Sequence, residues 1–200
     1  MTFHPRIDYA TFHRSERKLE GEGAAFAYTA DHLARFKEIV ARYPPDRQRS
    51  AVLPALYLVQ HQLGFVTANA MRYVAGLLEI TPADVEDVVS FYTMFYTKPV
   101  GTFVLQVCRT LSCALNGAER VTEALSEKLG IHPGQTDPSG TFTLLEVECL
   151  GACDRAPVVM VNDAWHECQK PEDASRLVDD LRARGEAALS GCHHVVEAKR

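Results

Sequence analysis

The sequence predicts an α/β protein, α+β overall, in which a bundle of helices is followed by a small sheet built in the order βαβ-ββα. Two patterns predict this class. Apolar residues recur at helical spacing up to about residue 97, and from about residue 98 they alternate along short runs, as strands do. We therefore expect a flexible amino-terminal arm over residues 1–28, a helical bundle over 29–97, a sheet domain over 98–185 and a tail over 186–200.

The composition limits the class of protein. Hydrophobic residues make up 46% of the 200 residues and charged residues 24%, which is the balance of an ordinary globular protein. The net charge of −5 provides no broad cationic surface, so we expect no nucleic-acid partner. No apolar run approaches the roughly 20 residues that cross a bilayer, so we expect no direct membrane insertion. Residues 1–27 contain no apolar signal core, and their mixed charges argue against a mitochondrial presequence.

The predicted bundle has four helices with legible starts and stops. The first covers residues 33–43 and stops at a pair of prolines, and the second starts near residues 47–50 and ends at Gly64. The third opens at Thr67, and the fourth opens at Thr81, which a proline and an acid follow in the first turn. Short helices with short connections predict a small antiparallel bundle. Its expected inward residues are Leu56, Val59, Leu63, Met71, Val74, Leu77, Leu78, Val85, Val88, Val89 and Tyr92.

An aromatic run closes the bundle and consists of Phe91, Tyr92, Phe95 and Tyr96. Because aromatic side chains at helical spacing usually belong to a core, we expect these four to pack inside the protein. The alternative is a docking surface, where the bundle meets the sheet domain or a partner subunit.

A strand, a helix and a second strand follow the bundle. Residues 102–107 and 141–148 alternate as strands do, and residues 116–129 have one apolar helical face, with Asn116 and Glu119 as an expected capping pair. This order is a βαβ unit, which has parallel strands and a right-handed crossover. Parallel strands end at the same edge of a sheet, so whatever follows the two strands is brought together.

Two cysteine pairs follow those two strand ends directly. The first pair is Cys108 and Cys113, in a C-x4-C spacing, and the second is Cys149 and Cys153, in a C-x3-C spacing. The topology alone therefore predicts that four thiols meet at one edge of the sheet.

Four converging thiols have several possible uses. Two disulfides do not suit a chain without a secretion signal that is long enough for a normal core. A thioredoxin-type redox site would need C-x-x-C, and the plant-type cluster motif would need a further cysteine just after Cys113. Structural zinc favours a two-residue spacer in at least one pair. The longer spacers favour a [2Fe–2S] cluster with two thiolates on each iron, while a zinc-binding assembly adaptor and a thiol–disulfide enzyme remain alternatives.

The residues around the cysteines suit an anionic cluster. Arg109 and Arg155 lie within or beside the two cysteine loops and supply positive charge. The helix expected to begin near Asn116 would point its positive end at Cys113. Small residues that allow close approach of backbone N–H groups to sulfur are Ser112, Ala114, Gly151 and Ala152.

The remaining elements complete the predicted sheet. Residues 158–161 read as a third strand and residues 164–167 as a fourth, joined by a turn at Asn162 and Asp163. Residues 171–184 read as a closing helix, with Leu177, Val178 and Leu181 facing inward. A βαβ unit followed by ββα matches a thioredoxin-like sheet, in which Pro157 would be the cis proline before the third strand.

The chain resembles the thioredoxin-like [2Fe–2S] ferredoxin family. The resemblance rests on Cys108-Arg-Thr-Leu-Ser-Cys113 and on Cys149-Leu-Gly-Ala-Cys153-Asp-Arg-Ala-Pro157-Val-Val-Met-Val-Asn162. Within that family the chain is similar to the E subunits of bacterial NADH:quinone oxidoreductase (respiratory complex I). This similarity covers about residues 30 to 185. It includes the helical segments from Tyr43-Pro44 to Pro54-Ala-Leu and from Val88 to Phe95.

This resemblance implies a function as well as a fold. It implies a [2Fe–2S] cluster with four ligands, at Cys108, Cys113, Cys149 and Cys153. It also implies a neighbouring subunit that carries FMN and the NADH site, and a further iron–sulfur subunit. The chain would then be an electron-carrying subunit of an oxidoreductase, on the cytoplasmic side of the membrane through its complex, with no complete active site of its own. Related subunits serve some NAD-linked formate dehydrogenases and hydrogenases, which are the alternative hosts.

Two further cysteines lie outside the motif. Cys168 follows a predicted strand, and we expect it to be a free, buried thiol. Cys192 precedes two histidines in the predicted tail, where we expect solvent exposure rather than a metal site.

Overall fold

The computed structural model of the chain describes residues 25–189 and 193–194. The described residues form two compact units that divide between Pro99 and Val100. Most of the predicted amino-terminal arm lies outside the described residues, as does Cys192. No helix of the described part of the chain is long and apolar enough to cross a membrane.

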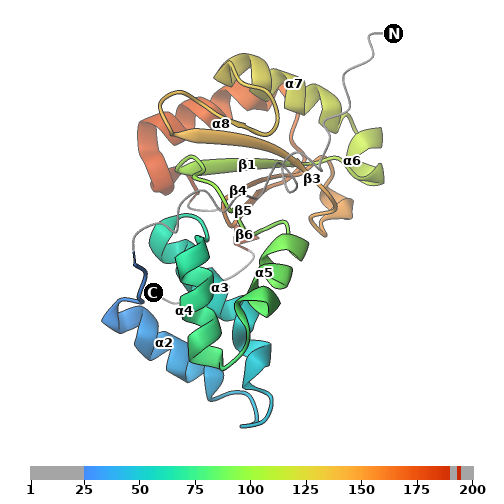
Figure 1. Cartoon of the computed structure of the whole chain (residues 1–200). Coiled ribbons are helices and arrows are strands. Elements are labelled where there is room, and N and C mark those ends of the chain that lie inside the picture. Colours follow the sequence, from blue (N-terminus) through green and yellow to red (C-terminus); the bar gives the residue numbers. More distant parts are fainter. Residues whose placement is uncertain (1–24, 190–192, 195–200) are drawn as a thin grey trace. The chain divides into compact units, whose positions relative to one another are not determined.

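The first unit consists of short helices, and two of them start at predicted caps. Thr67 accepts the backbone N–H of Ala70 before the third helix, as predicted. Thr29 accepts that of His32 before the first helix, a cap that was not predicted, so this helix begins before residue 33. Thr81 and Asp84 form a reciprocal capping box, as predicted. The elements are α2 (Ala30–Val40), the 3-10 turn η1 (Gln48–Ala51), α3 (Val52–Leu63), α4 (Ala68–Leu78) and α5 (Pro82–Phe91), and they are labelled in Figure 1.

The core of this unit contains most of the residues predicted to face inward. Leu56, Val59 and Val74 are completely buried. Two predictions were wrong, because Leu63 is 39% exposed and Leu77 is 36% exposed. Leu63 is the last residue of α3, and Leu77 lies about 100° around α4 from the buried Leu78, which directs the two side chains to different sides.

The aromatic run divides between core and surface. Phe95 is 2% exposed and packs edge-on against Tyr57, with ring centroids 5.3 Å apart, so the core prediction holds for this residue. Phe91 is 77% exposed, and for it the prediction was wrong. The helix ends at Phe91 and the chain is extended at Tyr92, so the four aromatic residues do not share one helical face.

The second unit is built on one mixed sheet. β1 and β3 are parallel, as predicted for a βαβ unit, and the other strand pairs are antiparallel. The described strands follow the order β2-β3-β1-β4-β5-β6 across the sheet. Their bounds are β1 Phe103–Cys108, β2 Gln135–Thr136, β3 Phe142–Val147, β4 Val159–Val161, β5 Ala164–His166 and β6 His193–His194.

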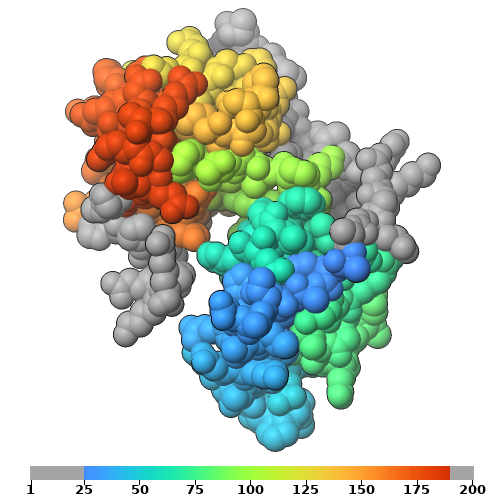
Figure 2. Space-filling model, turned by 90° about the vertical axis from the view of Figure 1, so that its left-hand side faces the viewer, coloured from blue at the N-terminus to red at the C-terminus, as the bar shows by residue number. Residues whose placement is uncertain are grey.

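The helices α7 (Ala118–Leu129) and α8 (Pro171–Arg184) cover the same face of the sheet (Figure 1). The buried core between them and the sheet includes Leu105, Leu125, Leu144, Val178 and Leu181. The closing helix has the predicted bounds and inward residues, and Figure 2 shows its outer side, in red, on the surface of this unit.

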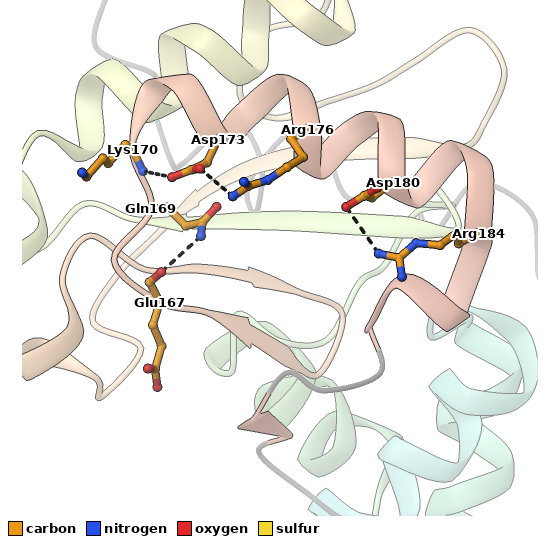
Figure 3. Close-up of polar contacts among 7 residues, drawn as sticks. All are labelled: Glu167, Gln169, Lys170, Asp173, Arg176, Asp180 and Arg184. Atoms are coloured by element: carbon orange, nitrogen blue, oxygen red, sulfur yellow. Dashed lines mark hydrogen bonds and ion pairs between the residues drawn. The ribbon is translucent and has the colours of Figure 1, made fainter.

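Local polar contacts define the start of α8. The backbone N–H of Lys170 donates to the Asp173 carboxylate over 3.1 Å, and Arg176 pairs with the same carboxylate at 2.7 Å (Figure 3). Closer to the end of the helix, Arg184 lies 3.3 Å from Asp180. These contacts satisfy the backbone N–H of the residue that caps the helix and place opposite charges at favourable spacing along it.

The predicted helix over residues 116–129 is α7, which begins two residues later than predicted, at Ala118. A separate short helix, α6 (Leu111–Leu115), precedes it and was not predicted. Gly117 separates them with a φ of 92°, a left-handed conformation that favours glycine. Asn116 therefore does not cap α7 with Glu119. It ends α6, where its side-chain amide donates to the Ser112 carbonyl over 2.7 Å.

Part of the predicted tail, residues 186–200, forms secondary structure. The 3-10 helix η3 (Gly185–Leu189) buries Ala188 and Leu189 against the sheet core, and β6 pairs with β5. Neither element was predicted from the sequence.

Candidate metal centre

The four motif cysteines lie at one end of the parallel strand pair. Cys108 is the last residue of β1 and is level with Val147, the last residue of β3. Cys113 lies inside α6, which sits at this end of the strands (Figure 1). Cys149 follows β3 after one residue, and Cys153 begins the short 3-10 turn η2 (Cys153–Arg155).

The first pair of thiols is buried. Cys108 and Cys113 are each 3% exposed. Burial opposes the ionisation of both thiols, whereas the N–H and hydroxyl of Thr110 favour the Cys108 thiolate and the N–H of Val158 favours the Cys113 thiolate. Nearby donors of this kind stabilise negative charge on sulfur.

The second pair of thiols is exposed. The Cys149 and Cys153 sulfurs are 3.6 Å apart, and the backbone N–H of Gly151 donates to the Cys149 sulfur over 3.4 Å. Gly151 has a φ of 81°, so the tight loop between the two cysteines uses the conformational freedom of glycine.

The two pairs lie close enough for their charges to interact. Besides burial, the charges of Cys108 and Cys153 raise the pKa of Cys113, so the first pair is affected by a sulfur of the second. Burial of Cys108 is offset in part by the backbone N–H of Leu150, which lies in the second cysteine loop. The structure therefore brings together two thiol pairs that lie about forty residues apart in the sequence, as the topology predicted.

The pKa values of three of the thiols depend on their neighbours as well as on burial. Burial raises the pKa of Cys113 to about 11, and the neighbouring Cys108 and Cys153 sulfurs add to that increase. The Cys149 thiol, followed by burial and the Cys108 charge, raises the pKa of Cys153. Burial opposes ionisation of Cys108 as well, but the N–H groups of Thr110 and Leu150 outweigh it, so the pKa of Cys108 is lowered. Gathered thiolates repel one another, and a bound cation would remove that penalty.

The two arginines predicted to supply positive charge are paired with carboxylates. Arg109 lies 3.5 Å from Glu148, and Arg155 lies 3.5 Å from Asp154 and 3.8 Å from Glu167. Their positive charge is therefore largely offset. Cys113 itself lies within the short helix α6, and the helix expected to begin near Asn116 begins at Ala118. The donors at the sulfurs are mostly backbone N–H groups and hydroxyls.

The donor set fits a two-iron cluster. Among the described residues, no three or more His, Cys, Asp or Glu side chains are grouped so as to hold a single metal ion. The Cys149 and Cys153 sulfurs lie instead as a close pair with the Gly151 N–H directed at one of them, and the Cys108 and Cys113 thiols affect each other's ionisation. A [2Fe–2S] cluster takes four thiolates, and hydrogen bonds to its sulfur atoms help to set its potential. These four thiols could hold such a cluster.

Comparison with known proteins identifies the family. The chain matches the family model of the thioredoxin-like [2Fe–2S] ferredoxins over residues 36–182. It belongs to that family. Membership indicates a [2Fe–2S] cluster as the cofactor of this ferredoxin-family chain, and it agrees with the resemblance predicted from the cysteine motifs.

Related sequences are named as E subunits of NADH-quinone oxidoreductase. The chain is 45% identical to the relative from Mycobacterium tuberculosis over 166 residues, which cover 81% of this chain and 65% of that protein. It is 41% identical to the relative from Rickettsia bellii, covering 78% of this chain and 95% of that protein. The chain thus spans about 65% of the length of the mycobacterial relatives and nearly all of the rickettsial one.

A solved structure shares the fold. An NAD+-reducing [NiFe]-hydrogenase in the H2-reduced state aligns with a TM-score of 0.59 at 19% identity, covering 67% of this chain and 22% of the hydrogenase chain. At this identity the likeness concerns the fold alone.

Two other predictions about the ferredoxin-family chain can be compared with its structure. The Ala156–Pro157 peptide bond is cis, as predicted. Cys168 is exposed rather than buried, so that prediction was wrong. It follows β5 in a left-handed turn with a φ of 51°, and its backbone N–H donates to the Arg155 carbonyl over 2.8 Å. The turn directs the backbone inward and leaves the thiol outside.

Ser112 was expected only to be a small residue beside the cysteines. In this ferredoxin-family chain the Cys149 thiol and burial raise the pKa of Cys153, and the Ser112 hydroxyl opposes that increase. Its position next to Cys113 was the available signal, but a helix of five residues, Leu111–Leu115, has too few turns for periodicity to reveal which side chains face the site.

Proposed function

We propose that this chain is the E-type subunit of an NADH:quinone oxidoreductase, in which it holds one [2Fe–2S] cluster and exchanges single electrons with FMN on a partner subunit. The names of the relatives and the high coverage of this chain support the assignment. The observation that carries it is the meeting of two thiol pairs at the ends of β1 and β3.

The proposed ligands are Cys108 and Cys113 for one iron and Cys149 and Cys153 for the other. Support comes from the mutual effect of the Cys108 and Cys113 thiols on their ionisation and from the 3.6 Å separation of the sulfurs in the second pair. A [2Fe–2S] cluster bound there supplies reversible one-electron transfer. The chain itself contributes thiolates, N–H donors and shape, and none of its side chains is assigned an acid, base or nucleophile role.

The difference in exposure between the two cysteine pairs supports a side of approach for the partner subunit in electron exchange. Cys108 and Cys113 are shielded from water by the sheet and α6, whereas Cys149 and Cys153 lie at the surface. A partner that carries flavin would therefore approach over the loop between Cys149 and Cys153. The proposed partners are the flavin- and NADH-binding subunit and a further iron–sulfur subunit, with the chain peripheral to the cytoplasmic membrane through that complex.

Metal analysis of anaerobically purified protein tests the cofactor proposal. We expect two irons and two acid-labile sulfides per chain, and an EPR signal that appears only after one-electron reduction. One zinc per chain and no iron would support the assembly-adaptor alternative instead. Thiol–disulfide exchange activity in metal-free protein would support the thiol enzyme alternative.

Co-purification tests the host complex. Affinity purification of the tagged chain from its native cell, followed by identification of the bound subunits, should recover a flavoprotein and quinone-reducing components. Recovery of a hydrogenase or formate dehydrogenase large subunit in their place would contradict the assignment to NADH:quinone oxidoreductase and leave the electron-transfer role standing.

A further inference from the structure

Cys149 and Cys153 form an exposed pair of thiols whose sulfurs are in contact. The two sulfurs lie 3.6 Å apart, and both residues are exposed. A disulfide has a sulfur–sulfur distance of about 2.05 Å, so the two atoms would have to approach each other by about 1.5 Å. Rotation of the two side chains, together with a small movement of the loop between them, can supply this approach.

The loop between these two cysteines has room to move. Gly151 lies at its centre, is exposed and has a φ of 81°. Among the described residues other than its chain neighbours, no heavy atom lies within 4 Å of the point where a side chain at Gly151 would begin. The turn that carries Cys153 is held more firmly. The Arg155 N–H donates to the Ala152 carbonyl over 3.0 Å, and the Arg155 carbonyl accepts the N–H of Cys168 over 2.8 Å. We therefore expect the first half of the loop to move toward the second.

The other two motif cysteines are shielded from dissolved reagents. Cys108 and Cys113 are each 3% exposed and belong to the hydrophobic core of the second unit. Thiol–disulfide exchange needs direct access of the reagent to a sulfur, so a dissolved disulfide reaches the exposed pair far more easily than the buried pair. The four motif thiols are therefore unequal toward a thiol oxidant.

We propose that in the metal-free chain Cys149 and Cys153 are a redox-sensitive modification site that closes to an internal disulfide. The co-reactant is a low-molecular-weight disulfide of the glutathione class. One cysteine thiolate attacks a sulfur of this reagent, which forms a mixed disulfide and releases one small thiol. The second cysteine thiolate then attacks the protein sulfur of the mixed disulfide and releases the second small thiol. The protein loses two protons and two electrons, and the reagent gains both.

Closure of this disulfide would block loading of the centre, a step that rests on the proposed function. The disulfide removes both thiolates proposed for one of the two irons and leaves the buried half of the ligand set. Because metal binding needs free thiolates, the disulfide must be reduced before the centre is assembled. The exchange is stoichiometric, with one disulfide per chain, and it differs from catalytic turnover of disulfides in other proteins.

The test uses the metal-free full-length chain with Cys168→Ser and Cys192→Ser, which leaves the four motif cysteines as its thiols. After incubation with oxidised glutathione, we expect two of these four thiols to be lost, as measured by thiol titration in denaturant. Mass spectrometry should find no attached glutathione, and peptide mapping should place the disulfide between Cys149 and Cys153. Cys149→Ser in the same background is the matched control, in which Cys153 should keep one glutathione as a mixed disulfide.

Reconstitution with ferrous iron and sulfide provides a second readout. The oxidised chain should take up no two-iron centre, as measured by iron analysis and visible absorbance. Treatment of the oxidised chain with dithiothreitol should restore uptake to that of a chain that was never oxidised.

The outcomes separate this proposal from the proposed function. Retention of all four thiols, loss of all four, or a disulfide that includes Cys108 or Cys113 would overturn it. Full iron uptake by the oxidised chain would overturn it as well. Failure of the reduced chain to take up two irons would instead contradict the proposed function, and the thiol count and the peptide map would still decide whether the disulfide forms.

Discussion

Single residues determine what the candidate centre can bind, and the contrast among the five described cysteines shows this. Cys108 and Cys113 are buried, Cys149 and Cys153 are exposed but 3.6 Å apart, and Cys168 is exposed. Burial alone therefore does not identify a ligand. What the four motif cysteines share is a hydrogen bond or a close sulfur neighbour at the same edge of the sheet.

Changing each cysteine to serine separates ligands from bystanders. We expect Cys108→Ser, Cys113→Ser, Cys149→Ser and Cys153→Ser each to lower the iron content well below two per chain, because a serine oxygen replaces a soft thiolate that iron prefers. Cys168→Ser is the matched control and should keep the full content. Iron and sulfide analysis with visible absorbance spectra would measure this. Full iron content in any of the four motif variants would remove that residue from the proposed ligand set.

At the scale of secondary structure, the turn before β3 makes stability depend on pH. Burial raises the pKa of Asp137, but the Ser139 hydroxyl and the N–H groups of Phe142 and Thr141 lower it more, so the pKa lies below its ordinary value. The Asp137 carboxylate therefore stabilises the folded state fully above the unfolded-state pKa of about 3.9. This contribution to the free energy of unfolding is lost as the pH falls through the lower folded-state pKa.

Asp137→Asn should remove this pH dependence while keeping an oxygen acceptor for the two N–H groups. Urea unfolding between about pH 5 and pH 2.5 should show a steeper loss of stability in the wild type than in the variant. Asp163→Asn, which changes an exposed carboxyl in the turn between β4 and β5, should behave like the wild type. Equal slopes for the wild type and Asp137→Asn would contradict this account.

The elements that the sequence predicts best are those long enough to show a period. β1, β3 and α8 were predicted within one or two residues, because six alternating residues or fourteen helical ones carry a clear pattern. α6 has five residues and β2 has two, which is too few to show a periodic pattern. Convergence of the cysteines followed from the parallel topology. The position of the Ser112 hydroxyl depends on a local turn, as does the exposure of Phe91 and Cys168. The hydrophobic pattern of the sequence does not predict those turns.

At the scale of the whole chain, each compact unit has its own hydrophobic core. One cluster contains Leu56, Val59 and Val85, and the other contains Leu105, Leu144 and Val178, with no buried residue in common. All four motif cysteines lie after Val100, in the second unit. We propose on this basis that the second unit is an independent folding domain that holds the centre by itself.

Expression of residues 100–200 alone tests this proposal. We expect a folded fragment that retains two irons per chain, because the core and the thiols are all present in it. Circular dichroism would report the fold, and iron analysis would report the centre. The full-length chain purified in parallel is the control. A fragment that is unfolded, or that lacks iron while the full-length chain holds it, would show that the first unit is required.

The Asp137–Gly140 turn lies at the beginning of β3, and the thiols lie beyond its end. Six strand residues separate the two, a span of about 20 Å. A residue with a reactive side chain, introduced in place of the exposed Pro138, would therefore attach the protein to an electrode surface by the side remote from the sulfurs. Immobilised in that orientation, the chain would leave its thiol edge accessible to soluble electron donors.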